Sequence, residues 1–328
     1  KTLYPPAFAG DFRVSDVEMQ IPEVDDTMIA EASGHNDFED LVEEVFTDAD
    51  VYEDGPPQLK EAELAKLDDE MDNHEEQRLV EMGVLVPLTE EDDKNMATLS
   101  AKFVRDWRWR QDKWTRRSRL VAREFRWLNP SLGDLYAPSS LSSTLRVMAS
   151  LAATDEDVAL WSIDVSDAYL QVPQDEPKIL RVQGKDQNGK SVNYKIMFNL
   201  PGQRCGARGW YQYFADKLHE VKVEPYVAAP AIFAGPGIAL SRHVDDAQLM
   251  GGVPQGEDLI RHLEACGLKL KVEGPAFVNK GKVRFLKRTF EGTPNGFVIY
   301  QEDRYVNKLL EILVLKDAKP KSTPWPAG

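Results

Sequence analysis

The sequence predicts an α+β fold in which helices and strands alternate. Apolar runs indicate strands over 159–172 and 238–249, amphipathic helices over 142–154 and 206–221, and a strand pair over 102–121. No GxGxxG or Walker sequence is found, which disfavours a parallel sheet that binds nucleotides through such loops. The 328 residues are 42% hydrophobic, enough for a substantial core.

The helices are predicted from the spacing of their apolar residues. Over 206–221, three bulky apolar residues recur every four positions, which gathers them on one helical face. The helix over 142–154 has similar spacing, and Ser142 or Ser143 can cap its first turn. A third helix is predicted over 59–82, where leucine and methionine recur among Glu and Lys. This acidic helix could begin the folded domain or stand alone in solvent.

The most basic stretch of the chain, 102–121, is predicted to be a β-hairpin with a turn at Gln111-Asp112-Lys113. Its aromatic residues fall on one side of an alternating pattern. Arginines interleaved with aromatic rings suit a surface that binds phosphates or stacks on bases. The alternative is a solvated strand face with the tryptophans in the core.

Charge is distributed very unevenly along the chain. Residues 1–95 carry a net charge of −23, whereas the remainder carries +8. An acidic segment joined to a basic body indicates contact with nucleic acid. Residues 1–58 are predicted to be an acidic, mostly disordered linker. This linker could be a spacer, or it could compete with nucleic acid for the basic hairpin.

Cysteine usage and hydropathy bear on the compartment. Cys205 and Cys266 are too few for a disulfide framework or a cysteine-rich zinc site. No run approaches the roughly 18 apolar residues of a membrane span, and no signal peptide pattern opens the chain. We therefore expect an intracellular protein, in a cytoplasmic particle or the nucleus, that is not secreted and has no membrane partner. Because the first residue is Lys1, the chain could be a piece of a longer polypeptide.

Two apolar runs carry carboxylates, and these are the candidate catalytic residues. The first is Ile163-Asp164-Val165-Ser166-Asp167-Ala168-Tyr169, and the second is His243-Val244-Asp245-Asp246. A buried carboxylate is costly unless it is paired, hydrogen-bonded or bound to a metal. If the runs met in space, they would form a site for Mg²⁺ or Mn²⁺, which prefer oxygen ligands. The structural alternative is a capping or turn role for one aspartate.

The two runs resemble motifs A and C of reverse transcriptases. Further matches to the copia-type branch of LTR retrotransposons occur in family order: Arg119-Leu120-Val121-Ala122-Arg123, Tyr136-Ala137-Pro138, Leu200-Pro201-Gly202-Gln203-Arg204-Cys205-Gly206-Ala207-Arg208-Gly209-Trp210, Phe285-Leu286-Lys287 and Lys319-Pro320-Lys321-Ser322-Thr323-Pro324. Each match alone has little specificity, but the ordered set is highly specific. Over roughly 75–324, the chain is similar to the reverse transcriptase domain of a Pol polyprotein.

This resemblance implies a right-hand polymerase fold over 59–324. Fingers are expected over about 75–150, a palm with an antiparallel sheet over about 151–270, and a partial thumb or connection over about 271–324. The implied activity is RNA-directed DNA synthesis, in which deoxynucleoside triphosphates are added to a primer 3′-OH. The implied partners are an RNA or DNA template-primer and other parts of a Pol polyprotein, such as integrase and ribonuclease H.

The resemblance also assigns roles to residues. It implies that Asp164 and Asp245 bind the catalytic metals, with Asp246 beside them and the backbone carbonyl of Val165 as a further ligand. Tyr169 would exclude a ribose 2′-OH, with ordinary core packing as the alternative. The implied nucleotide-binding residues are Arg119, Asp167, Ala168, Tyr169, Gln203 and Arg204, and the implied nucleic-acid-binding residues are Lys113, Arg116, Arg117 and Arg123. For Arg204, surface solvation is the alternative.

The chain departs from the family pattern at several positions. His243 replaces the tyrosine common at its position, and Gly206 with Gly209 would loosen the start of the motif B helix. Protease and integrase signatures are missing, and the chain ends before a ribonuclease H domain would begin. A catalytically silent remnant that only binds nucleic acid is therefore the alternative function. Another two-metal enzyme, such as an RNA polymerase with a related palm, is disfavoured by Tyr169.

Overall fold

The computed structural model describes residues 52, 55–89, 96–124, 135–182 and 192–316. In chain order its elements are α4 (Glu61–Glu81), β1 (Leu85–Pro87), β2 (Thr98–Arg110), β3 (Lys113–Arg123), α5 (Ser142–Ala152), β4 (Val158–Val165), the 3-10 helix η1 (Ala168–Gln171), β5 (Pro173–Val182), β6 (Val192–Phe198), α6 (Gly206–His219), β7 (Glu224–Tyr226), β8 (Ala229–Gly235), β9 (Ile238–His243), β10 (Asp246–Gly252), α7 (Val253–Ala265), β11 (Leu270–Ala276), β12 (Lys282–Phe285), β13 (Arg288–Thr293), β14 (Gly296–Gln301) and α8 (Asp303–Ile312). The predicted linker over 1–58 lies almost entirely outside the described residues.

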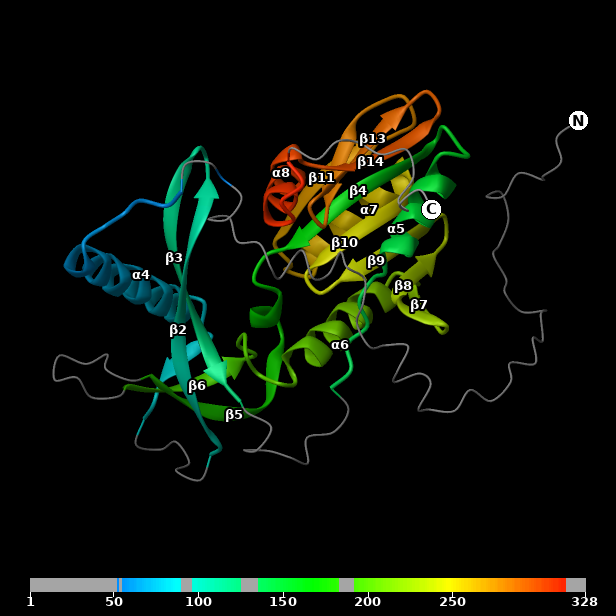
Figure 1. Ribbon diagram of the computed structural model, residues 1–328. Helices are drawn as coiled ribbons and strands as arrows, with labels where there is room; N and C mark the ends of the chain where they lie inside the picture. Colours follow the sequence, from blue (N-terminus) through cyan, green and yellow to red (C-terminus); the bar gives the residue numbers. More distant parts are fainter. Residues whose placement is uncertain (1–51, 53–54, 90–95, 125–134, 183–191, 317–328) are drawn as a thin grey trace, which may run out of the picture.

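The strands form three sheets (Figure 1). A five-stranded sheet has the order β1-β6-β5-β2-β3, a six-stranded sheet has the order β11-β4-β10-β9-β8-β7, and a three-stranded sheet has the order β12-β13-β14. The chain passes from the five-stranded sheet to β4 in the six-stranded sheet, returns through β5 and β6, and then crosses back. The fold is therefore mixed α/β, and neither large sheet is one continuous stretch of sequence.

The predicted hairpin over 102–121 is confirmed as β2 and β3. Trp109 pairs with Trp114 near its tip, and Gln111 and Asp112 form the turn with φ of 51° and 56°. Asp tolerates this left-handed conformation better than most residues do. In an antiparallel pair, successive side chains point to opposite faces. One face of the hairpin contacts α4, and the other points away from it.

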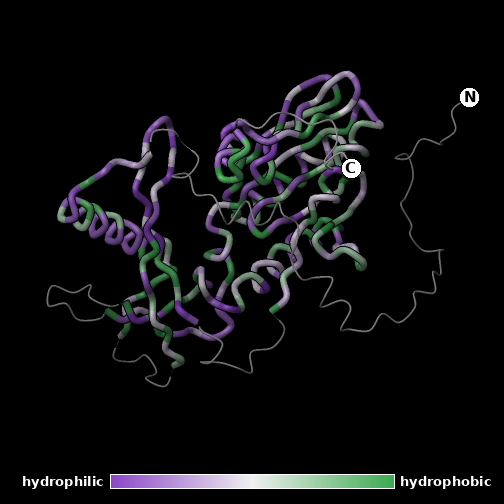
Figure 2. Tube along the Cα trace, in the orientation of Figure 1, coloured by the Kyte–Doolittle hydropathy of each residue, from purple (hydrophilic) through white to green (hydrophobic). Residues whose placement is uncertain are grey.

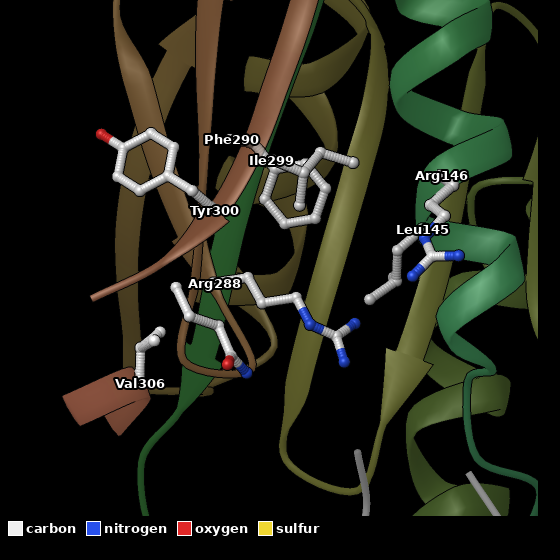
Figure 3. A pocket seen from close by; sticks show the side chains of 8 residues that line it. Leu145, Arg146, Arg288, Phe290, Ile299, Tyr300 and Val306 are labelled. Carbon is white, nitrogen blue, oxygen red and sulfur yellow. The ribbon is translucent and has the colours of Figure 1, made fainter. Parts of the chain in front are cut away.

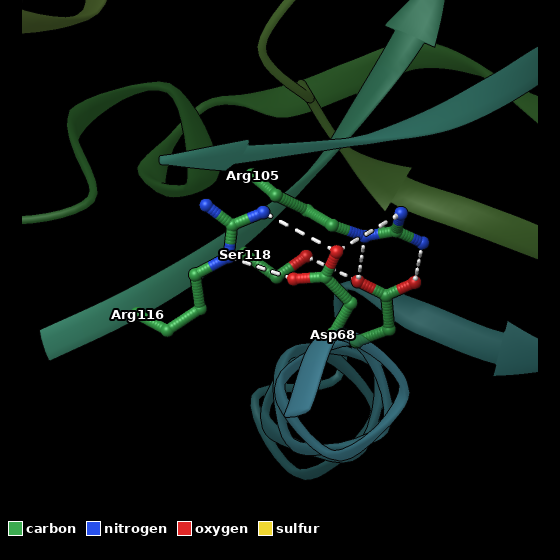
Figure 4. Close-up of polar contacts among 5 residues, drawn as sticks. Asp68, Arg105, Arg116 and Ser118 are labelled. Atoms are coloured by element: carbon green, nitrogen blue, oxygen red, sulfur yellow. Dashed lines mark hydrogen bonds and ion pairs between the residues drawn. The ribbon is translucent and has the colours of Figure 1, made fainter. Parts of the chain in front are cut away.

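The helix α4 packs on this hairpin through carboxylates (Figure 4). Asp72, which is 1% exposed, accepts hydrogen bonds from Arg105 Nε at 3.0 Å, Arg105 Nη2 at 2.7 Å and Ser118 Oγ at 2.6 Å. Asp68 accepts from Arg116 Nε at 2.7 Å and Nη2 at 3.2 Å. The predicted helix is confirmed, and it belongs to the folded domain. Its buried face is largely acidic, although the prediction rested on leucine and methionine.

Two local predictions are corrected by the structure. The strand predicted over 159–172 ends at Val165, because Asp167 takes a left-handed φ of 55° and η1 follows. The ion pair from Arg78 Nη1 to Asp167 Oδ2, at 2.8 Å, fastens this turn to α4. At the start of α5 the N-cap is Leu141, and Ser142 Oγ accepts a hydrogen bond from Arg288 Nη1 at 3.1 Å. Ser142 therefore contacts β13 and does not cap its own helix.

The main core lies between the six-stranded sheet and the helices α6 and α7. Trp210 and Phe214 of α6 are each 1% exposed, as the predicted amphipathic helix requires, and they pack with Trp161 of β4 and with Leu259 of α7. Figure 2 shows hydrophobic segments gathered in this part of the molecule, whereas α4 and the outer half of the β2–β3 hairpin are mostly hydrophilic. The strands β4 and β10, which carry the two carboxylate runs, are thus packed on this hydrophobic core.

Candidate active site

Strand pairing brings the two carboxylate runs together. β4 and β10 are antiparallel neighbours, and Asp164 is the direct partner of Asp246. Val165 N donates a hydrogen bond to Asp245 O at 3.0 Å. The four residues expected at a metal site, Asp164, Val165, Asp245 and Asp246, therefore meet at one end of the six-stranded sheet.

A strained two-residue turn carries Asp245. Asp246 pairs with His243, which leaves Val244 and Asp245 between β9 and β10. Val244 has a φ of 54°, a conformation that is a genuine outlier for a β-branched residue and costs about 1–3 kcal/mol. Trp210 Nε1 of α6 donates a hydrogen bond to Val244 O at 2.7 Å. The helix α6 thus holds the turn in place.

Both acidic and basic side chains lie around Asp245. The pKa of Asp245 is raised by partial desolvation of its carboxyl group, and the nearby Asp164 raises it further, while Arg119 and His243 oppose the shift. Lys271, the direct partner of Asp164 on β11, places its Nζ 2.5 Å from Asp164 Oδ2. A partly desolvated Asp245 beside the charge of Asp164 fits a divalent cation, because such an ion would relieve the repulsion between the two carboxylates.

Tyr169 lies against the first turn of α6. A Cβ added to Gly206 would be 3.0 Å from Tyr169 Cδ1 and 3.1 Å from its Cε1, closer than ordinary carbon contacts of about 3.5–4.0 Å. Burial raises the pKa of Tyr169, and the Asp245 carboxylate raises it further. A side chain at position 206 would therefore crowd the Tyr169 ring, which explains the glycine there. The sequence predicted only that this glycine loosens the start of the helix.

Three neighbouring residues that were predicted to bind nucleotide, Asp167, Ala168 and Gln203, are buried or make polar contacts within the fold. Ala168 is buried at 3% exposure, and Asp167 is paired with Arg78 as described above. Gln203 is 6% exposed, and its Oε1 accepts hydrogen bonds from Leu200 N at 2.6 Å and Gln174 Nε2 at 2.7 Å. Gln203 thereby orders the loop that leads into α6.

The loop before α6 is fastened to the base of the hairpin. Arg204 N donates to Glu124 Oε2 at 2.9 Å, and Ala122 N donates to Pro201 O at 2.8 Å. Gly202 has a φ of 86°, and a Cβ there would lie 2.2 Å from Ala122 O. A hollow of about 450 Å³ lies at this junction, lined by Lys102, Ala122, Arg123, Glu124 and Gly202.

The hairpin's alternation sorts its arginines onto two faces. The strand β3 points one set of side chains away from α4: Lys113, Arg117, Arg119 and Arg123. Burial lowers the pKa of Arg117 to about 10, and the neighbouring Arg119 and Arg110 lower it further, which indicates a concentrated positive potential on this face. Arg116 belongs to the opposite face. Its side chain is only 12% exposed, and its guanidinium is paired with Asp68.

Three residues of the site were missed from the sequence. They are Trp210, which holds the turn, Lys271, which pairs with Asp164, and Arg242, which is 2% exposed. The Arg242 guanidinium lies 5.3 Å from the ring centre of Tyr211, and burial lowers its pKa to about 10. An arginine inside the apolar run before His243 was the available signal for Arg242.

A second hollow is unrelated to the carboxylates. It measures about 310 Å³ and lies between α5 and the strands β13 and β14 (Figure 3). Its wall consists of Leu145, Arg146, Arg288, Phe290, Ile299, Tyr300, Gln301 and Val306. None of these side chains is a carboxylate, so this hollow offers no charged oxygen ligands to a metal.

Comparison with known proteins indicates a retroelement origin. No family model matches the chain. The chain is similar to a retrotransposon Pol polyprotein, which supports a retrotransposon Pol origin for the chain. This relative is described as the retrovirus-related Pol polyprotein from transposon TNT 1-94 of Nicotiana tabacum, and it is 25% identical over 205 residues. The match covers 58% of this chain and 14% of the polyprotein. Among the described residues, no helix combines the length and apolar character that crossing a membrane requires.

Proposed function

We propose that the chain is the RNA-directed DNA polymerase of a retrotransposon. The observation that carries this proposal is the register of β4 and β10, which sets Asp164 opposite Asp246 and brings Asp245 to Val165. Relationship to a Pol polyprotein supports the same conclusion. The reaction is attack of a primer 3′-OH on the α-phosphate of a deoxynucleoside triphosphate, for which no covalent protein nucleophile is needed.

Asp164, Asp245 and the carbonyl oxygen of Val165 would hold the metal ions. These hard oxygen donors suit Mg²⁺ or Mn²⁺. Bound there, a pair of such ions would supply charge that activates the attacking oxygen and stabilises the leaving oxygen. The protein supplies the positions of its ligands, because the paired strands and the turn at Val244 fix both carboxylates before substrate arrives.

The three sheets correspond in this proposal to parts of a right-hand polymerase. The six-stranded sheet with α6 and α7 is the palm, the five-stranded sheet with α4 is the fingers, and the three-stranded sheet with α8 is a partial thumb. The fingers then include β5 and β6 as well as β2 and β3. The face of β3 opposite α4 is directed at the substrate.

The basic face of β3 binds phosphates in this account. Arg119 meets the incoming triphosphate, since it is exposed and its charge acts on Asp245. Lys113, Arg117 and Arg123 contact the template-primer backbone, where binding depends on charge and salt. Arg116 is left out of this set because Asp68 already occupies its guanidinium.

Sugar selection falls to Tyr169. Its ring lies against Gly206 of α6, and the Asp245 carboxylate is close enough to raise its pKa. The ring therefore cannot move toward α6 when a ribose 2′-OH approaches. Substituting Tyr169 with Ala should relax discrimination against ribonucleotides. Unchanged ribonucleotide use by a folded Tyr169→Ala variant would reject this assignment.

The test of the polymerase is primer extension on poly(rA) primed with oligo(dT) in Mg²⁺. The active chain should extend the primer, and Asp245→Asn should abolish extension while retaining the fold. The Lys271–Asp164 ion pair favours a second candidate, a catalytically silent protein that only binds nucleic acid, because a lysine already neutralises one metal ligand. Template binding without extension by the folded chain would select that candidate.

A further inference from the structure

A cluster of three metal-ligating side chains lies away from the carboxylate site. Glu220 follows the last residue of α6, and His262 and Cys266 lie at the end of α7. Their ligand atoms all fall within 4.8 Å of one another. Neither the polymerase proposal nor the packing of the core uses this combination. We infer that Glu220, His262 and Cys266 form a zinc-binding site that joins the ends of α6 and α7.

The spacing of the ligand atoms is close to that of a tetrahedral zinc site. Cys266 Sγ is 3.6 Å from His262 Nε2 and 3.7 Å from Glu220 Oε2, and the last two atoms are 3.6 Å apart. Bonds of about 2.3 Å to sulfur and about 2.0–2.1 Å to nitrogen and oxygen give tetrahedral edges of about 3.3–3.6 Å. The three side chains therefore need shifts of only a few tenths of an ångström to share one ion.

The ligand set selects for zinc over the ion of the carboxylate site. A thiolate and an imidazole are soft or borderline donors, which suit Zn²⁺ and its spectroscopic substitute Co²⁺, whereas Mg²⁺ prefers oxygen alone. Cys266 as thiolate and Glu220 as carboxylate together balance the charge of a divalent ion. With three protein ligands, water takes the fourth position of the tetrahedron.

The fold favours a cation at this place. Glu220 and Cys266 are the C-caps of α6 and α7, and helix C-termini carry partial negative charge. His262 and Cys266 are four residues apart, so their side chains share one face of α7. Lys217 Nζ donates to Glu220 Oε1 at 2.9 Å and orients the carboxylate whose other oxygen faces the cluster.

His262 makes a hydrogen bond that zinc binding would break. Its Nε2 lies 2.8 Å from the carbonyl oxygen of Lys217 in the last turn of α6. Metal binding uses the Nε2 lone pair, so this hydrogen bond is given up and the ion links the two helices in its place. Since α6 also carries Trp210, which holds the turn at Val244, the zinc site braces the helix that supports the carboxylates.

Zinc content measured after dialysis tests the inference. The full chain is equilibrated with Zn²⁺ in excess Mg²⁺, which occupies the oxygen sites, and bound zinc is measured by elemental analysis. About one zinc ion per chain is expected, with loss of most of it in Cys266→Ser and in His262→Ala. The chain offers matched controls: Cys205→Ser and His219→Ala, which should keep their zinc.

Cobalt substitution gives a second readout that does not depend on stability. Co²⁺ should produce a thiolate charge-transfer band in the unaltered chain and in Cys205→Ser, and no such band in Cys266→Ser. Should the substitutions in α7 prevent folding, the exposed Glu220→Gln is the variant to use, and it should weaken zinc binding at least tenfold. Zinc retained by folded Cys266→Ser, or none bound by the unaltered chain, would overturn the site.

Discussion

Trp210→Phe isolates the hydrogen bond that holds the turn at Val244. The indole Nε1 donates to Val244 O at 2.7 Å, and Val244 keeps a strained φ of 54°. Phe fills most of the same space but cannot donate. Loss of the donor leaves the Val244 carbonyl without this partner, which costs about 1–3 kcal/mol of stability. The smaller ring buries less apolar surface, which costs about 1–2 kcal/mol more. We expect the free energy of unfolding to fall by about 2–5 kcal/mol.

The effect on catalysis should exceed the effect of a generally weakened core. Released from Trp210, Val244 can relax toward an ordinary backbone conformation, which moves the adjacent Asp245. A misplacement of about 1 Å can cost roughly a hundredfold in rate. The assay is single-turnover primer extension over a range of Mg²⁺ concentrations, combined with urea unfolding.

The matched control is Trp161→Phe. Trp161 is 2% exposed and belongs to the same core, but it packs against Gly256, and its strand partner is Leu249 and not a residue of the turn. It should lose only the contact contribution to stability and little activity. Equal losses of activity in Trp210→Phe and Trp161→Phe, at equal folded fraction, would refute the claim that the hydrogen bond positions Asp245.

Three further substitutions test separate contacts. Asp72→Asn replaces the carboxylate that binds the Arg105 guanidinium with a neutral amide, and it should lower the free energy of unfolding by about 1–3 kcal/mol. An unchanged urea unfolding curve would show that other contacts hold α4. Gly206→Ala places a methyl group 3.0 Å from the Tyr169 ring and should cost about 1–3 kcal/mol by overpacking, with slower deoxynucleotide incorporation; normal kinetics would contradict the close approach. Lys271→Ala removes the cation from Asp164, the proposed metal ligand, and should lower the Mg²⁺ concentration needed for half-maximal extension. An unchanged Mg²⁺ requirement would count against competition between Lys271 and the metal.

Local patterns in the sequence were sufficient for several elements. Strand alternation and the polar turn at Gln111 and Asp112 specified the β2–β3 hairpin, and the spacing of Trp210 and Phe214 specified α6. The unusual place of the carboxylates inside two apolar runs marked Asp164, Asp245 and Asp246 as candidates, and the family resemblance implied that they lie together; the Asp164–Asp246 register itself comes from the structure. The hairpin and α6 could be predicted because residues close in sequence carry the information for both.

Features set by distant contacts could not be predicted in the same way. The end of β4 depends on Asp167, whose left-handed turn is paired with Arg78 of α4, far away in sequence. The basic stretch gave no means to tell Arg116 from Arg117, because that distinction requires knowing that α4 covers one face of the hairpin. Lys271 became a neighbour of Asp164 only through the pairing of β11 with β4.

The most direct test of the central claim is Mg²⁺-dependent extension of an oligo(dT) primer on poly(rA) by the chain and by Asp164→Asn. Asp69→Asn on the exposed side of α4 is the matched control. The account predicts extension that requires Mg²⁺ or Mn²⁺, is kept by Asp69→Asn, and is reduced at least a thousandfold by Asp164→Asn. Extension by folded Asp164→Asn equal to that of the unaltered chain, or none from a folded, template-binding chain, would contradict it.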